Sequence, residues 1–157
     1  MSHVPRSAPH VQGSPVVWRL AVAERRKALA VGDEVPVVRR APDAVDLFMF
    51  SASAWLIHRI HYDLPFTTEH DGHPGLLVHG PLQGTYMIQS VTGWLGRSAR
   101  LLTTSYRHLA PAYLDDELEC GGEVMEIGEG RATFELWVRK SDGTVTTKGT
   151  ATFEVNT

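Results

Sequence analysis

The apolar residues of this chain follow two periods, one typical of helices and one typical of strands. The helical period is clearest in residues 81–95, where the apolar positions are Leu82, Tyr86, Met87, Val91, Trp94 and Leu95. Small residues lie between them and allow neighbouring elements to approach closely. Pro81 suits the first turn of a helix, and Gly96 is a natural stop. The pattern predicts a central helix that other structure surrounds.

After residue 96 the period changes to that of strands. Four strands are expected, at residues 100–108, 117–127, 131–140 and 145–155, with Asp, Gly and Ser in the turns between them. In the third, Ala132, Phe134, Leu136 and Val138 alternate with Thr133, Glu135, Trp137 and Arg139. This alternation indicates a sheet with one face more buried than the other. Short turns predict that consecutive strands pair antiparallel, as a four-stranded meander.

Two further elements are expected before the central helix. Residues 34–39 form a strand rich in valine, and Asp43 is a candidate N-cap for a helix that begins at Ala44. The apolar residues of that helix follow helical spacing: Val45, Phe48, Met49 and Ala52. Residues 66–75 are polar and contain glycine, so a loop is expected there.

The N-terminal residues have a different character. Residues 1–16 are polar, contain three prolines and lack periodicity, so they are expected to form a disordered tail. Residues 17–30 are rich in helix formers and predict a short amphipathic helix. Its cluster Arg25-Arg26-Lys27 is either a solvated face or a contact for a phosphorylated ligand such as coenzyme A. The chain is thus expected to have a single domain at 17–157, an α+β fold whose antiparallel sheet curls around one helix.

Composition narrows the class of protein. The chain has 157 residues, 43% of them hydrophobic, and a net charge of −3, which fits one soluble domain with a sizeable core. The charge does not favour a nucleic-acid partner, and no apolar run has membrane-spanning length or resembles a secretory signal. The single cysteine, Cys120, excludes an internal disulfide and is expected to be structural. We therefore expect a cytoplasmic protein.

Histidines gather just before and at the start of the central helix. Five of the eight histidines lie between His58 and Gly80. A histidine exchanges protons near neutral pH, and the free amides of a helix N-terminus, here at Gly80, suit a developing oxyanion. A metal site at His58, His61, His70, Asp71 and His73 is the competing interpretation. The loop-like spacing and the absence of an HExxH motif argue against it, so no metal is expected.

Three segments resemble a known family. HRIHYD from His58, HPGLLVHGPL from His73 and YRHLAPAYLDDELECGGEV from Tyr106 are similar to the MaoC-like hydratases and dehydratases of enoyl thioesters. The sequences HRIHYD and VHGPL are most similar to the branch of mesaconyl-CoA-type hydratases and mitochondrial hydroxyacyl-thioester dehydratases. The resemblance implies a hot dog fold and an acyl-CoA or acyl-carrier-protein thioester as substrate, with no cofactor. It also implies that His61 is the general base, that the Gly80 amide holds the thioester carbonyl, and that Asp63 supports the loop.

One position departs from the family pattern. The family carries Asp, or Asn in the closer branch, five residues before the histidine, where it orients the water; this chain has Leu56. Leucine neither accepts nor donates a proton. His58, Tyr62 or groups of another chain are then left to hold water beside His61. The alternative is a non-catalytic chain that binds the acyl thioester or serves as the partner subunit of a hetero-oligomeric hot dog hydratase.

The remaining candidates are contacts to the substrate. Leu56 and Tyr62 flank the catalytic segment, and His79 and Pro81 flank Gly80; for His79 a structural role is the competing interpretation. Arg107 is a candidate contact for a polar acyl group or the pantetheine arm. Alternation places Arg107 and His108 on opposite faces of their strand, so at most one of them reaches the pocket.

Other hydrolytic chemistry fits poorly. The chain lacks a GxSxG elbow, which argues against a nucleophilic hydrolase. Residues 81–96 contain no Asp or Glu, which argues against a hot dog thioesterase with a carboxylate on the helix. A single hot dog unit is half of the usual assembly, so a homodimer is expected, with a heterodimer containing a second hot dog chain as the alternative.

Overall fold

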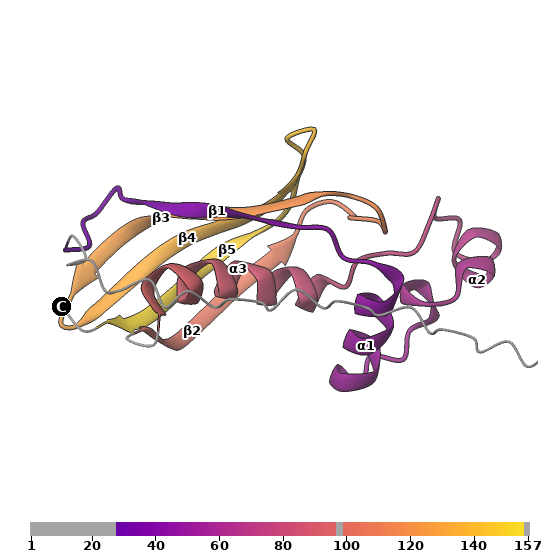
Figure 1. Ribbon diagram of the computed structural model, residues 1–157, viewed down its shortest axis with the longest axis horizontal. Helices are drawn as coiled ribbons and strands as arrows, with labels where there is room; N and C mark the ends of the chain where they lie inside the picture. The colour runs from indigo at the N-terminus through magenta and orange to yellow at the C-terminus, as the bar shows by residue number, and fades with distance from the viewer. Residues whose placement is uncertain (1–27, 97–98, 156–157) are drawn as a thin grey trace, which may run out of the picture.

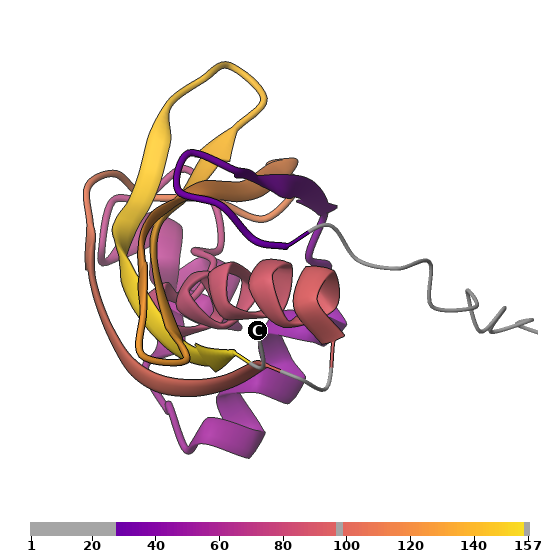
Figure 2. The same ribbon diagram turned by 90° about the vertical axis from the view of Figure 1, so that its left-hand side faces the viewer.

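The computed structural model describes residues 28–96 and 99–155. One antiparallel sheet curls around one helix, α3 (Gly80–Leu95), as Figures 1 and 2 show. The five strands are β1 (Glu34–Arg40), β2 (Ala99–His108), β3 (Leu118–Gly128), β4 (Arg131–Lys140) and β5 (Val145–Val155). The predicted α+β architecture is confirmed. The tail expected at residues 1–16 and most of the helix expected at 17–30, with its basic cluster, lie outside the described residues.

The core forms between α3 and the concave face of the sheet. Met87 and Val91 of α3 are buried against the inward side chains of β4, which are the predicted alternating set Ala132, Phe134, Leu136 and Val138. The Phe134 ring meets Trp94 of α3 edge-on at a centroid distance of 6.4 Å. Burial of this apolar surface is what holds the helix inside the sheet.

The strand order corrects one prediction. The order is β1-β3-β4-β5-β2, so β2 pairs with β5 and not with β3. The four strands therefore do not form a simple meander, although the β3–β4 and β4–β5 pairs are antiparallel as predicted. The connection at residues 109–117 crosses the end of α3, where Val78 N–H donates to the Ala112 carbonyl at 2.8 Å. This crossing carries the chain from one edge of the sheet to the opposite side.

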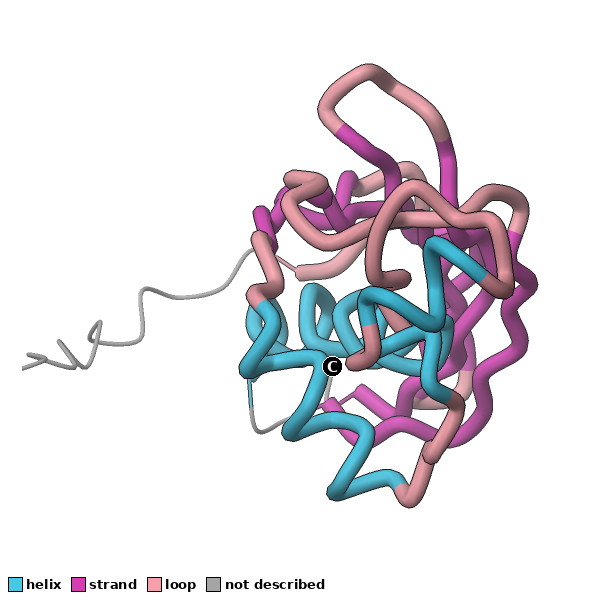
Figure 3. Tube along the Cα trace, turned by 90° about the vertical axis from the view of Figure 1, so that its right-hand side faces the viewer, coloured by secondary structure: helices cyan, strands magenta, loops and turns pink. Residues whose placement is uncertain are grey.

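Two short helices lie beyond the N-terminal end of α3 (Figures 1 and 3): α1 (Ala44–Ala54) and α2 (Leu64–Glu69). Asp43 caps α1 as predicted, through a capping box with Asp46. The loop expected at residues 66–75 is wrong in its first part, because α2 extends to Glu69. The Asp63 carboxylate caps α2 at the Phe66 amide, and proline lies in its first turn, which together stabilise this helix.

The helical stripe predicted for α1 does not face the core. Val45, Phe48 and Met49 are exposed, and the buried residues of α1 are Leu47 and Ser51.

Cys120 is buried in β3, and burial raises the pKa of its thiol to about 12, so it is an unreactive thiol at neutral pH. Among the described residues, no helix combines the length and the apolar character needed to span a membrane.

Candidate active site

His61 ends a single 3₁₀ turn, η1 (Arg59–His61), that follows α1. Its Nδ1 lies 2.9 Å from the Leu77 carbonyl oxygen. A carbonyl only accepts hydrogen bonds, so Nδ1 carries the proton and donates. The tautomer of the neutral ring is thereby fixed, and Nε2 is left as a proton acceptor.

The surroundings of His61 keep its ring neutral. Burial lowers the pKa of His61 below its usual value, the hydrogen bond to Leu77 opposes this effect, and the nearby His58 lowers the pKa further. The side chain is half-buried. At neutral pH the imidazole is therefore uncharged and able to take a proton from a reactant.

The first residue of α3 is Gly80, as the sequence predicts. Within the described part of the chain, its amide N–H makes no hydrogen bond, and His79 at the N-cap offers no side-chain cap. Pro81 follows and has no N–H to donate. The Gly80 amide therefore lies at the positive end of the helix dipole with its donor capacity unused, which suits an anionic oxygen.

His61 and Gly80 line one cavity of about 350 Å³. Two further polar side chains, Gln83 and His108, belong to its wall; the rest of the lining is Leu77, Val78, Leu109, Ala110, Pro111 and Ala112. The residue that carries the proton acceptor and the residue that carries the free amide thus line the same largely apolar space. Low polarity around such groups strengthens their electrostatic effect on a bound reactant.

His79 lies under the His61 ring. The two rings are stacked, with centroids 3.7 Å apart and planes 19° apart. His79 is fully buried, its Nε2 lies 2.8 Å from Ser51 Oγ in α1, and its Nδ1 has no hydrogen-bond partner among the described residues. Burial, with a smaller effect of His61, lowers the pKa of His79 to about 4. A neutral ring therefore supports His61 from below, and His79 lines neither this cavity nor the next one.

A second cavity, of about 530 Å³, also has His61 in its wall. It is lined by Trp55, Leu56, Ile57, His58, Arg59, His61 and Phe66. Leu56 therefore faces this cavity and does not line the one that contains Gly80. His61 is the residue shared by the two cavities, since it belongs to the wall of both.

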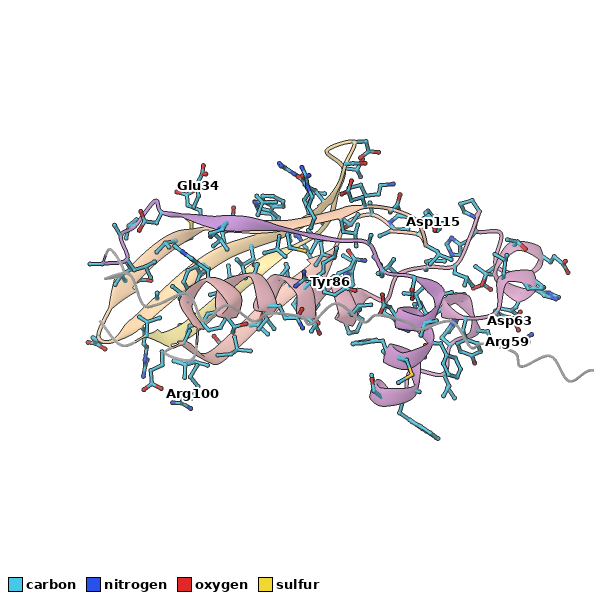
Figure 4. The ribbon with its side chains drawn as sticks, in the orientation of Figure 1. Glu34, Arg59, Asp63, Tyr86, Arg100 and Asp115 are labelled. Carbon is cyan, nitrogen blue, oxygen red and sulfur yellow. The ribbon has the colours of Figure 1, made fainter. Side chains whose placement is uncertain are left out.

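The neighbours of His61 in the sequence have structural contacts. His58 is exposed, and its Nδ1 accepts from the Ile60 amide at 3.4 Å. The Tyr62 hydroxyl donates to the Ile57 carbonyl at 2.8 Å. Asp63 caps α2 and pairs with Arg59 at 2.6 Å; the two side chains lie close together in Figure 4. Tyr62 and Asp63 line neither cavity.

The structure separates Arg107 from His108. Both residues are exposed, but only His108 lines the cavity with Gly80, and Arg107 lines neither cavity. Pro81 is exposed and also lies outside both walls. Strand alternation predicts that only one of Arg107 and His108 reaches the pocket, but it does not say which one. Sequence reasoning favoured Arg107 and missed His108 as a wall residue.

A buried polar cluster behind His108 was also missed. Gln83 Oε1 accepts hydrogen bonds from the hydroxyls of Thr146 at 2.7 Å and Thr147 at 2.9 Å. All three residues are buried, and Thr147 Oγ1 lies 2.9 Å from His108 Nδ1. The signal in the sequence was a glutamine inside the apolar pattern of the central helix.

Among the described residues, no group of His, Cys, Asp and Glu side chains could hold a metal ion.

Comparisons with known proteins identify relatives. Residues 21–114 match the family model of hydroxyacyl-thioester dehydratase type 2. The mesaconyl-C(4)-CoA hydratase of Chloroflexus aurantiacus is 39% identical over 72 residues, which are 46% of this chain and 25% of that protein. The chain thus spans about a quarter of the length of this curated relative.

Solved structures share the fold. The (R)-hydratase from A. caviae involved in PHA biosynthesis has a TM-score of 0.78 and 21% identity, and the match covers 83% of this chain and 100% of that chain. One chain of the ChsH1-ChsH2 complex from Mycobacterium tuberculosis has a TM-score of 0.74 and 20% identity, with 81% and 98% covered. At these identities the likeness shows the hot dog fold of MaoC-like proteins.

Proposed function

Because the chain belongs to the hydroxyacyl-thioester dehydratase type 2 family, we propose that it hydrates enoyl thioesters or, in reverse, dehydrates 3-hydroxyacyl thioesters. The substrate is an acyl group carried on coenzyme A or acyl carrier protein. One observation carries the proposal: His61, with Nε2 unprotonated, and the unbonded Gly80 amide line the same cavity. The two groups match what the reaction needs, a proton acceptor and a donor for the carbonyl oxygen.

The proposed step balances with water as the only second reactant. The thioester carbonyl accepts a hydrogen bond from Gly80 N–H, and His61 Nε2 takes a proton from water as its oxygen bonds to the β-carbon. Electrons move through the double bond to the carbonyl oxygen, where the helix N-terminus stabilises the negative charge. The His61 imidazolium then returns the proton to the α-carbon. Proton transfer contributes about 100- to 10,000-fold to the rate, and one amide donor on the order of 100- to 1,000-fold.

A second candidate function follows from Leu56. Its side chain offers no polar atom to water, and the family position for orienting water is therefore apolar in this chain. A non-catalytic subunit that retains the fold and the cavity is the alternative, and it would act beside a second hot dog chain. Strands β1 and β2 are the two edges of the sheet and are candidates for pairing with a second copy or with such a partner.

Turnover separates the two candidates. The purified chain is mixed with crotonyl-CoA and with mesaconyl-CoA, and loss of the conjugated thioester absorbance is followed for wild type, His61→Ala and His70→Ala. His70 lies outside both cavities and is the matched control. Turnover that disappears only in His61→Ala supports the enzyme. Absence of turnover in wild type, with binding of either thioester retained, favours the subunit, and light scattering then shows whether the chain is alone or paired.

A further inference from the structure

His108 packs directly against the first residue of α3. The three heavy atoms nearest to a β-carbon built on Gly80 all belong to the His108 ring, and Nε2 is the nearest of them. This nitrogen therefore lies against the Gly80 α-carbon, beside the proposed oxyanion amide. Both residues line the cavity that His61 lines.

The cluster behind His108 fixes its tautomer. The single hydroxyl proton of Thr147 is donated to Gln83 Oε1 at 2.9 Å. Thr147 Oγ1 can then only accept from His108 Nδ1, from which it lies 2.9 Å away. When the His108 ring carries one proton, that proton is on Nδ1, and Nε2, the atom nearest to Gly80, is an acceptor. His61 has the same arrangement, with Nδ1 bonded to the Leu77 carbonyl.

The rigidity of this cluster suits a positioning task. Thr146 and Thr147 are fully buried, and both hydroxyls converge on the Gln83 carbonyl. His108 and Thr147 are also direct partners in the β2–β5 pairing. The His108 side chain itself is exposed. The hydrogen bond at Nδ1 and the contact with Gly80 restrict the rotation of the ring, which helps to preorganise Nε2.

We propose that His108 is a second catalytic residue, whose Nε2 accepts a hydrogen bond from the water that His61 deprotonates. This inference rests on the proposed function. Water donates one proton to His61 Nε2 and its other hydrogen bond to His108 Nε2, so its oxygen lone pair is directed at the β-carbon. His61 returns the proton to the α-carbon, and His108 ends the cycle unchanged. Orientation of water, for which Leu56 has no polar atom, is then supplied from the other wall of the site.

The test compares four variants with wild type in the enoyl-CoA assay. His108→Ala is expected to lower kcat on the order of 10- to 100-fold, as misplacement of a reactant does, with KM changed by less than about 3-fold. His108→Gln, which restores an acceptor near Nε2, retains more activity than His108→Ala. Leu56→Asn gives no gain, because position 56 faces the other cavity. His70→Ala is the control for removal of a histidine.

Three results overturn the proposal: unchanged kcat in His108→Ala, a loss that lies only in KM, or a gain in kcat in Leu56→Asn. A second readout separates failure of this proposal from failure of the proposed function. Butyryl-CoA, which has no double bond to hydrate, is titrated into wild-type protein while the ring nitrogens of His61 and His108 are followed by NMR. Both Nε2 signals are expected to shift with one binding curve. A shift of His61 alone, or of neither ring, contradicts the shared site even if turnover is absent.

Discussion

Gly80→Ala is predicted to damage activity while leaving the fold intact. A β-carbon at this position lies 2.6 Å from His108 Cε1 and 2.8 Å from Cδ2, with Nε2 closer still. Real β-carbons essentially never lie closer than 3.0 Å to such an atom, so the ring must turn away. The hydrogen bond of 2.9 Å between His108 Nδ1 and Thr147 Oγ1 is then lost.

The two effects on stability nearly cancel. Loss of one hydrogen bond costs about 0.5–1.5 kcal/mol. Replacement of glycine by alanine at a position whose backbone conformation suits both adds about 0.4–1 kcal/mol. The net change in the free energy of unfolding is therefore expected to stay within about 1 kcal/mol, or roughly 2–4 °C in Tm for a chain of this size. The cavity, however, receives a methyl group beside the amide and loses the placed imidazole, so kcat/KM is predicted to fall on the order of 10- to 100-fold, as in His108→Ala.

Thermal unfolding and enoyl-CoA turnover measure the two predicted effects. Gly93→Ala is the matched control, because it lies in the same helix and a β-carbon there meets no atom within 4 Å. It is expected to stabilise the protein by about 0.4–1 kcal/mol and to leave turnover unchanged. In a His108→Ala background, Gly80→Ala should cost much less activity, because the ring is already absent. Wild-type kcat/KM in Gly80→Ala, or an equal loss in both backgrounds, would refute the reasoning.

Three further predictions address the base, the buried histidine and the sheet. His61→Gln is predicted to lower kcat/KM on the order of 100- to 10,000-fold without changing Tm; a smaller loss in steady-state turnover would mean that another group takes the proton. His79 has a folded pKa of about 4, below its unfolded value of about 6.5, so the unfolded state binds the extra proton between these values and stability is lost as the pH falls. Urea unfolding at pH 7 and pH 5 should show a drop larger by on the order of 2 kcal/mol in wild type than in His79→Gln, and equal drops would contradict this. Gly122→Ala would drive a β-carbon into the Glu135 carbonyl oxygen across the β3–β4 pair; a loss of about 1–3 kcal/mol in urea unfolding is expected, and an unchanged midpoint would show that the strands can separate at no cost.

The periodic parts of the fold could be predicted from the sequence. The alternation around Phe134 identified β4, and the apolar spacing around Met87 identified α3, because one buried face imposes its period on the residues. The helix α2 was not predicted, because the polar residues after Pro65 indicated a loop, and the capping role of Asp63 was not inferred. The position of β2 beside β5 left no such signal, since pairing across the sheet depends on the path of residues 109–117.

Only part of the candidate site could be predicted from the sequence. His61 and Gly80 could be singled out by residue chemistry and by the family resemblance, and the structure brings them to one cavity. His108 could not be chosen over Arg107, because alternation gives relative faces and not absolute ones. The contact of His108 with Gly80 joins the end of β2 to the start of α3, which lie 28 residues apart in the sequence. Local sequence patterns do not predict long-range contacts of this kind.

Uptake of oxygen from isotopically heavy water is the most direct test of the central claim, that His61 and the Gly80 amide together hydrate an enoyl thioester. Purified wild-type protein and His61→Gln are incubated with crotonyl-CoA in heavy-oxygen water, and the product is analysed by mass spectrometry. We predict that wild type forms labelled 3-hydroxybutyryl-CoA and that His61→Gln forms it more slowly by a factor on the order of 100 or greater. Equal labelling by the two proteins, or none by wild type, would contradict the claim.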